Sequence, residues 1–174
     1  MASQALVARL AEAQIGSTYN QYARSALRRE RLGEYLARRA EAPLMLVGEA
    51  AGYRGARVSG LPFTSERQLT GAGPAEASAT IVHRVLAELG LEEHVLLWNL
   101  VPTHPHRAGE PDSNRRPTPA EVAAARSFVD ELAVRRRVIA VGRLAEGVLD
   151  VASVRHPAHG GAADFRAGLR RLLG

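Results

Sequence analysis

Short apolar segments separated by helical segments constrain the fold of this chain more than any other feature. Each of the first three segments is four residues long, mostly aliphatic, and followed at once by glycine or asparagine, which is typical of strands buried on both faces. The fourth segment contains fewer apolar residues, and a His-Pro pair follows it. The four predicted strands are residues 44–47, 95–98, 138–141 and 152–155.

The segments between these strands have the apolar spacing of helices. Thr118 before Pro119 is the expected N-cap of one of them, because threonine accepts from free amides and proline fits the first turn. Strands that alternate with helices predict an α/β fold of three layers, with helices on both faces of a central four-stranded parallel sheet. The predicted helices are residues 75–89, 119–134, 143–149 and 163–173.

The length and composition predict one domain over residues 1–174, with residues 1–40 as a helical extension packed on it. The chain has 174 residues, 46% of them hydrophobic, and no tract resembles a linker. The extension has helical spacing, with a break at Gly16 and a second helix over residues 20–39. No apolar run is long enough to cross a bilayer and no signal peptide precedes the first helix. We therefore expect a monomer in the cytoplasm, at the nucleoid, with no membrane partner.

The chain contains no cysteine and no lysine. Zero cysteines exclude disulfides, a thiolate nucleophile and any cysteine-ligated iron–sulfur cluster. All 23 basic residues are arginines, so Schiff-base chemistry on a lysine is excluded as well. The net charge of +5 favours a polyanionic partner such as nucleic acid, because phosphate contacts release counterions.

Parallel sheets bind ligands at the carboxyl ends of their strands, so the loops expected to start at Gly48, Asn99, Gly142 and His156 are the candidate site. The first loop is glycine-rich and continues to Phe63, whose ring could stack on a nucleobase. The alternative is a tight strand-to-helix connection with a phenylalanine in the core.

Two further polar residues stand at predicted strand ends. The carboxamide of Asn99 could pair with the edge of a base, or could instead close its own loop as an Asx turn. His156, fixed by Pro157 and flanked by Arg155, could stabilise an anion that develops during bond cleavage, or could be an ordinary surface histidine.

Taken in chain order, these segments resemble the uracil-DNA glycosylase superfamily over residues 44–173, and their motifs are most similar to its iron–sulfur branch. The similar segments share glycine, proline, asparagine and histidine positions with that branch. They are Gly48-Glu49-Ala50-Ala51-Gly52, Gly60-Leu61-Pro62-Phe63, Asn99, Asn114-Arg115-Arg116-Pro117 with Glu121, residues 138–149, and His156-Pro157-Ala158.

The resemblance implies a DNA repair enzyme that flips uracil out of DNA and hydrolyses its N-glycosidic bond. Phe63 would stack on the ring, Asn99 would pair with its edge, and His156 would bond the uracil oxygen of the departing anion. The abasic site would remain uncut, because no lysine can supply lyase activity. The implied base-binding backbone is Gly48, Ala50, Ala51 and Gly52, and the implied DNA contacts are Ser65, Arg115, Arg116, Arg155 and His159.

Several positions depart from the family pattern. Ala50 stands where well-known members have a water-activating aspartate, which leaves Glu49 as the nearest carboxylate to orient water. Residues 53–55 lack the expected acidic residue, so nothing in the sequence explains how thymine's methyl group is rejected. Without cysteines there is no cluster, and no cofactor or metal is expected; packing and arginine contacts would hold residues 104–116. Asn114 replaces the histidine by which one branch traps DNA covalently, so ordinary turnover is expected.

Two other functions compete with this one. Four histidines and an aspartate could instead assemble a metal site for hydrolysis. A DNA- or base-binding module without catalysis is the other alternative, suggested by the missing aspartate. The candidate metal ligands are His104, His106, Asp112, His156 and His159.

Overall fold

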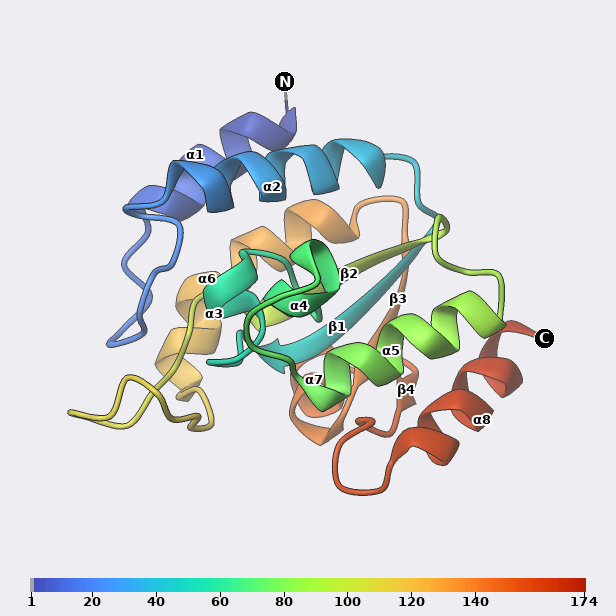
Figure 1. Cartoon of the computed structure of the whole chain (residues 1–174). Helices are drawn as coiled ribbons and strands as arrows, with labels where there is room; N and C mark the ends of the chain where they lie inside the picture. Colours follow the sequence, from blue (N-terminus) through green and yellow to red (C-terminus); the bar gives the residue numbers. More distant parts are fainter. Residues whose placement is uncertain (1) are drawn as a thin grey trace.

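A computed structural model describes residues 2–174 and has three layers, with a four-stranded sheet between two sets of helices (Figure 1). The strand order is β2-β1-β3-β4 and every pair is parallel. The predicted α/β class, the three layers and the parallel sheet are confirmed. The strands are β1 (Leu44–Ala50), β2 (Val95–Val101), β3 (Arg137–Val141) and β4 (Ser153–Val154).

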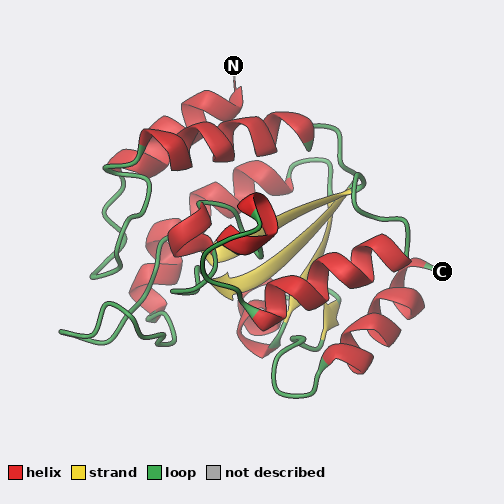
Figure 2. Ribbon diagram, in the orientation of Figure 1, coloured by secondary structure: helices red, strands yellow, loops and turns green. Residues whose placement is uncertain are grey.

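Helices cover both faces of the sheet (Figure 2). Two short helices, α3 and α4, lie in the connection after β1 and were not predicted. The helices are α1 (Ala2–Glu12), α2 (Ala26–Arg38), α3 (Ala56–Ser59), α4 (Glu66–Thr70), α5 (Ala77–Glu88), α6 (Pro119–Ala133), α7 (Arg143–Leu149) and α8 (Ala162–Leu173). None of the described helices is long and apolar enough to cross a membrane.

Alternate residues of β1 belong to two separate hydrophobic clusters, one on each face of the sheet. Met45 and Val47 pack with side chains of α1, α2 and α6 on one face. Leu46 packs on the other face with α5 and α8 and with Phe63. Because side chains alternate along a strand, Gly48 lies on the same face as Leu46 and Phe63. This is the face on which the candidate site forms.

The N-terminal helices share the first of these clusters with the sheet, through Leu6 and Leu10 of α1 and Leu32 and Leu36 of α2. Helix α2 begins after the N-cap Ser25, later than the predicted start at residue 20. The reason is a contact distant in sequence: Tyr19 and His104 exchange two backbone hydrogen bonds of 2.8 and 2.9 Å. This pairing holds Tyr19 in an isolated bridge, and residues 21–24 then form turns before α2.

Candidate functional site

The candidate site lies at the carboxyl ends of β1 and β2. Gly48 and Asn99 are direct partners in the parallel register of these two strands. Both were expected in loops, and the structure corrects this: β1 continues to Ala50 and β2 to Val101. Placement inside the sheet fixes the Asn99 backbone more firmly than a loop would, because ladder hydrogen bonds join β2, an edge strand, to β1.

Phe63 reaches the site because Gly48 has no side chain. A Cβ atom on Gly48 would lie 2.3 Å from Cζ of Phe63 and 2.9 Å from Oδ1 of Asn99, so any other residue would displace one of them. Phe63 itself has a φ of 49°, a left-handed conformation that is uncommon for an aromatic residue and often marks a functional position. The Thr64 hydroxyl, 3.0 Å from Nε2 of His83, holds the adjoining backbone.

Asn99 presents an unpaired amide to this region. Its side chain is 4% exposed, and no hydrogen bond joins its carboxamide to another of residues 2–174. The carboxamide atoms are not among the fully buried polar atoms that lack a partner, so they open onto the cavity that Asn99 lines. A ligand edge with one donor and one acceptor would supply the missing hydrogen bonds.

His156 approaches the same region from the loop after β4. The N–H of Ala158 donates to Nδ1 of His156 over 3.1 Å, so a neutral ring carries its proton on Nε2. Burial lowers the pKa of His156, and the nearby His159 acts in the same direction. The imidazole is therefore neutral at physiological pH, with an Nε2–H free to donate. Its centroid lies 6.5 Å from that of Phe63, with the rings tilted by 34°.

One small cavity, of about 50 Å³, collects these side chains. The structure thus brings together Phe63, Asn99 and His156, which the sequence placed in three separate loops. The cavity is lined by Glu49, Ala50, Gly52, Ala56, Phe63, Glu76, Asn99 and His156. Glu76 was missed by the sequence analysis, because it belongs to no recognisable motif and immediately precedes α5, where an acidic residue is unremarkable.

Glu49 follows Gly48 on β1 and is half-buried at the cavity. Burial raises the pKa of its carboxyl, and the positive charge of Arg116 partly offsets this shift. A carboxylate destabilised by partial burial is a better proton acceptor than a fully solvated one. Glu49 is thus suited to orient a water molecule.

A larger groove of about 910 Å³ adjoins the cavity and shares Glu49 and His156 with it. The groove also contains Arg155 and His159, which the sequence predicted as DNA contacts. Arg155 pairs with Asp164 at 2.7 Å but stays 56% exposed. Arg143, at the start of α7, is exposed in the same groove and was not predicted. The signal that could have found it is its place directly after the third strand.

Two predicted contacts are not supported. Ser65 was expected to hold a phosphate, but it is fully buried and forms the capping box of α4 with Gln68. The Ala51 amide was expected to help bind the base, but it donates to the Val101 carbonyl at 3.2 Å. Ala51 is buried behind the cavity, whereas Ala50 and Gly52 line it.

Arg115, also expected on DNA, is instead a structural residue. Its guanidinium donates to both carboxylate oxygens of Glu121, over 2.6 and 2.8 Å, and to the hydroxyl of Ser17 over 3.0 Å. Its Nε donates to the His106 carbonyl over 2.8 Å. Glu121 is only 3% exposed, and Arg115, the largest cause, lowers its pKa to about 2. We call this arrangement the Arg115–Glu121 brace; it ties residues 104–116 to the N-terminal segment.

The histidines of the alternative metal site are separated by their contacts. His104 is fully buried, and its Nδ1 donates to the Ala51 carbonyl over 2.7 Å. His106 stacks on the His104 ring, with centroids 5.8 Å apart, while His156 lines the cavity. Among residues 2–174, no three His, Asp or Glu side chains are grouped closely enough to hold a metal ion.

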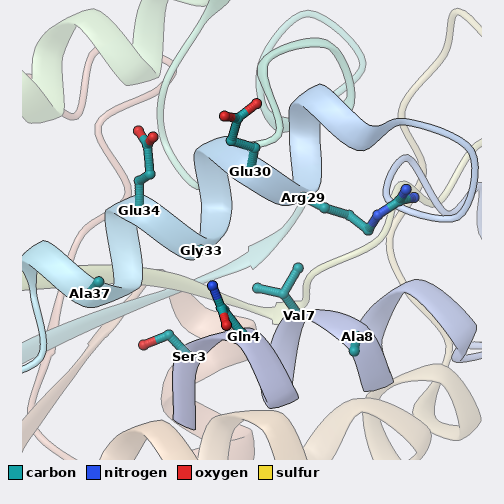
Figure 3. A pocket seen from close by; sticks show the side chains of 9 residues that line it. All are labelled: Ser3, Gln4, Val7, Ala8, Arg29, Glu30, Gly33, Glu34 and Ala37. Carbon is teal, nitrogen blue, oxygen red and sulfur yellow. The ribbon is translucent and has the colours of Figure 1, made fainter. Parts of the chain in front are cut away.

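A second groove of about 820 Å³ lies between α1 and α2 (Figure 3). Val7 of α1 points toward α2, whereas Glu30 and Glu34 of α2 point away from α1. It contains no histidine, asparagine or aromatic ring and lies away from the ends of the strands. This groove therefore lacks the three kinds of side chain that meet in the cavity at β1 and β2.

Comparison with known proteins shows the family of this chain. Residues 37–167 match the family model described as the uracil DNA glycosylase superfamily. The chain belongs to this superfamily. The match contains all the residues that line the cavity.

A solved structure extends the similarity to the N-terminal helices. The crystal structure of wild-type Pedobacter heparinus SMUG2 superimposes with a TM-score of 0.70 and covers 98% of this chain and 97% of that one, at 12% sequence identity. At this identity the likeness concerns the fold. No curated protein gave a significant match.

Proposed function

We propose that this member of the superfamily is a monofunctional uracil-DNA glycosylase, which flips uracil from DNA and hydrolyses its N-glycosidic bond. The observation that carries the proposal is the cavity at β1 and β2. It contains an aromatic ring, an unpaired carboxamide and a neutral imidazole. Those are the groups needed to stack on a base, read its edge and stabilise it as it leaves. The motifs resemble the iron–sulfur branch, and this chain would be a member without the cluster.

Recognition would begin when uracil leaves the base stack. Phe63 would stack on the ring, and the carboxamide of Asn99 would accept from N3–H and donate to O4. Cytosine presents the opposite pattern on that edge, and each unpaired buried group would cost about 1 to 3 kcal/mol. The unpaired state of Asn99 in the free protein supports this role, since only the base would supply its partners.

Cleavage would place negative charge on the base. As the bond between C1′ and N1 breaks, its electron pair passes to the uracil ring and onto O2, where the Nε2–H of His156 donates a hydrogen bond. The oxygen of a water molecule bonds to C1′, and the water gives one proton to the Glu49 carboxylate. Glu49 then loses that proton to solvent, and the uracil anion takes up a proton from solvent. The products are free uracil and an abasic sugar. The raised pKa of Glu49 and its place at the mouth of the cavity support its part in this step.

The test is an oligonucleotide with one uracil, incubated with the purified protein in EDTA. We expect release of free uracil and strand breakage only after alkali or heat, because the chain has no lysine for imine chemistry. Loss of activity in EDTA would point to the metal-dependent hydrolase.

A non-catalytic binding module is the second candidate, because Ala50 stands in the position of the family's aspartate. That module would bind uracil-containing or abasic DNA without releasing uracil. The same reactions distinguish it, because binding by gel shift with no free uracil would contradict the glycosylase.

DNA is proposed to lie along the larger groove, with Arg143, Arg155 and His159 toward its phosphates. Arg116 lines a neighbouring groove, and its charge acts on Glu49, so it would contact the DNA from beside the larger groove. Arg143→Ala is expected to weaken binding equally for uracil-containing and ordinary DNA, and to lower the slope of log K against log salt by about one. Fluorescence anisotropy over a salt series measures both. Arg38→Ala, which removes an exposed arginine of α2, is the matched control and should leave the slope unchanged. Equal slopes for all three proteins would remove Arg143 from the interface.

A further inference from the structure

Glu76 immediately precedes α5, yet its side chain does not cap the helix. It occupies the N-cap position, and no side-chain hydrogen bond satisfies the helix amides. Its Oε1 accepts instead from the Ser78 hydroxyl at 2.9 Å. No cation among the described residues forms an ion pair with it. The side chain lines the base cavity, and burial raises the pKa of its carboxyl.

The carboxylate fills space left by two glycines. A Cβ atom on either Gly52 or Gly55 would lie 2.4 Å from Oε2 of Glu76, far inside van der Waals contact. The turn after β1 therefore has no side chain of its own at these two positions. The carboxylate of Glu76, from a distant segment, forms that part of the cavity wall.

The position of this wall relative to a bound base follows from the other lining groups. Glu49 and His156 also line the outer groove, so they mark the mouth through which the sugar is attached. Gly52, Ala56 and Glu76 line the cavity but not the groove, so they lie on the side of the cavity away from that groove. With Phe63 on the ring face, Asn99 on the N3–O4 edge and His156 on O2, the ring edge left for this wall is the one at C5.

We propose that Glu76 determines specificity, closing the cavity beside C5 of the flipped pyrimidine so that the methyl group of thymine is excluded. This inference rests on the proposed uracil-DNA glycosylase function. It explains how thymine would be rejected. The sequence left this unexplained, because residues 53–55 carry no acidic side chain. The exclusion is steric, because the carboxylate occupies the volume that a C5 substituent would need.

Glu76→Ala tests the wall, with Glu76→Gln as the variant of equal size and Ser78→Ala as the control that removes only the hydrogen bond. Substrates carry uracil, 5-fluorouracil or thymine at one position. For Glu76→Ala we expect the thymine-to-uracil ratio of kcat/KM to rise at least about tenfold, the scale of accommodating one carbon. Glu76→Gln and Ser78→Ala should keep the wild-type ratio. An unchanged ratio in Glu76→Ala, or an equal rise in Glu76→Gln, would overturn the proposal.

A binding measurement with uncleavable DNA tests the role of Glu76 separately from the glycosylase activity. The same proteins are titrated with DNA that carries a 2′-fluoro uridine or thymidine analogue, whose glycosidic bond resists cleavage. Glu76→Ala should reduce the preference for the uracil analogue at least about tenfold. If the wild type prefers that analogue but releases no uracil, the glycosylase proposal fails while the wall stands. If the preference survives in Glu76→Ala, the wall is wrong whatever the catalytic result.

Discussion

Replacing His156 with alanine is expected to lower kcat for uracil excision by about 10²- to 10³-fold. This is the usual cost of removing one preorganised donor to a developing oxyanion. The donor here is the Nε2–H of a ring whose Nδ1 already accepts from the Ala158 amide. Because the charge on O2 develops only as the bond breaks, KM should change much less than kcat. Single-turnover release of uracil measures the effect.

His94→Ala is the matched control for this variant. His94 is an exposed histidine just before β2, at the opposite end of the sheet from the cavity. Its replacement should leave the excision rate at the wild-type value. Equal rates for His156→Ala and His94→Ala would remove His156 from the mechanism.

Replacing Arg115 with alanine is expected to lower the free energy of unfolding by about 3 to 5 kcal/mol, because it leaves a buried carboxylate without its partner. Glu121 is 3% exposed and accepts from both guanidinium nitrogens of Arg115. At this chain length the loss corresponds to a Tm lower by roughly 6 to 20 °C. Thermal unfolding followed by circular dichroism measures it.

Acid should remove the same stabilisation from the wild type. The pKa of Glu121 falls from 4.5 to about 2 on folding, chiefly through its hydrogen bonds with Arg115. A carboxyl whose folded pKa is lowered contributes stability above its unfolded pKa and loses it as the pH falls through the folded one. The contribution should therefore be complete above pH 4.5 and fade toward pH 2.

Arg126→Ala removes an exposed pair with Asp130 on the same helix, with side chains 45% and 57% exposed. It should cost at most about 1 kcal/mol. A loss as small in Arg115→Ala would contradict the structural role of the brace.

Much of the fold follows from local pattern in the sequence. The capping box of Thr118 and Glu121 at the start of α6 depends on residues three apart, so it can be recognised in the chain. The start of α2 was placed too early because the pairing of Tyr19 with His104 and the turns over residues 21–24 depend on the fold, although the N-cap Ser25 is a local signal. The ends of β1 and β2 were also placed too early, because each strand continues past its apolar run. Glu49 and Asn99 are polar, yet they belong to the strands.

The site was predictable where its residues belong to motifs. Phe63, Asn99 and His156 were named from the sequence, but the left-handed backbone of Phe63 was not. Arginines proved the hardest to assign, because the same side chain can bind a phosphate or a buried carboxylate. Arg115 meets Glu121, and only the folded chain shows that this pair also reaches Ser17.

The central claim is that Phe63, Asn99 and His156 surround one flipped uracil. The most direct measurement is a crystal structure of the protein with DNA that carries a 2′-fluoro uridine analogue. We predict the uracil ring against Phe63, its N3 and O4 bonded to the carboxamide of Asn99, and its O2 within hydrogen-bond distance of Nε2 of His156. A uracil still stacked in the DNA, or bound in another part of the protein, would contradict the account.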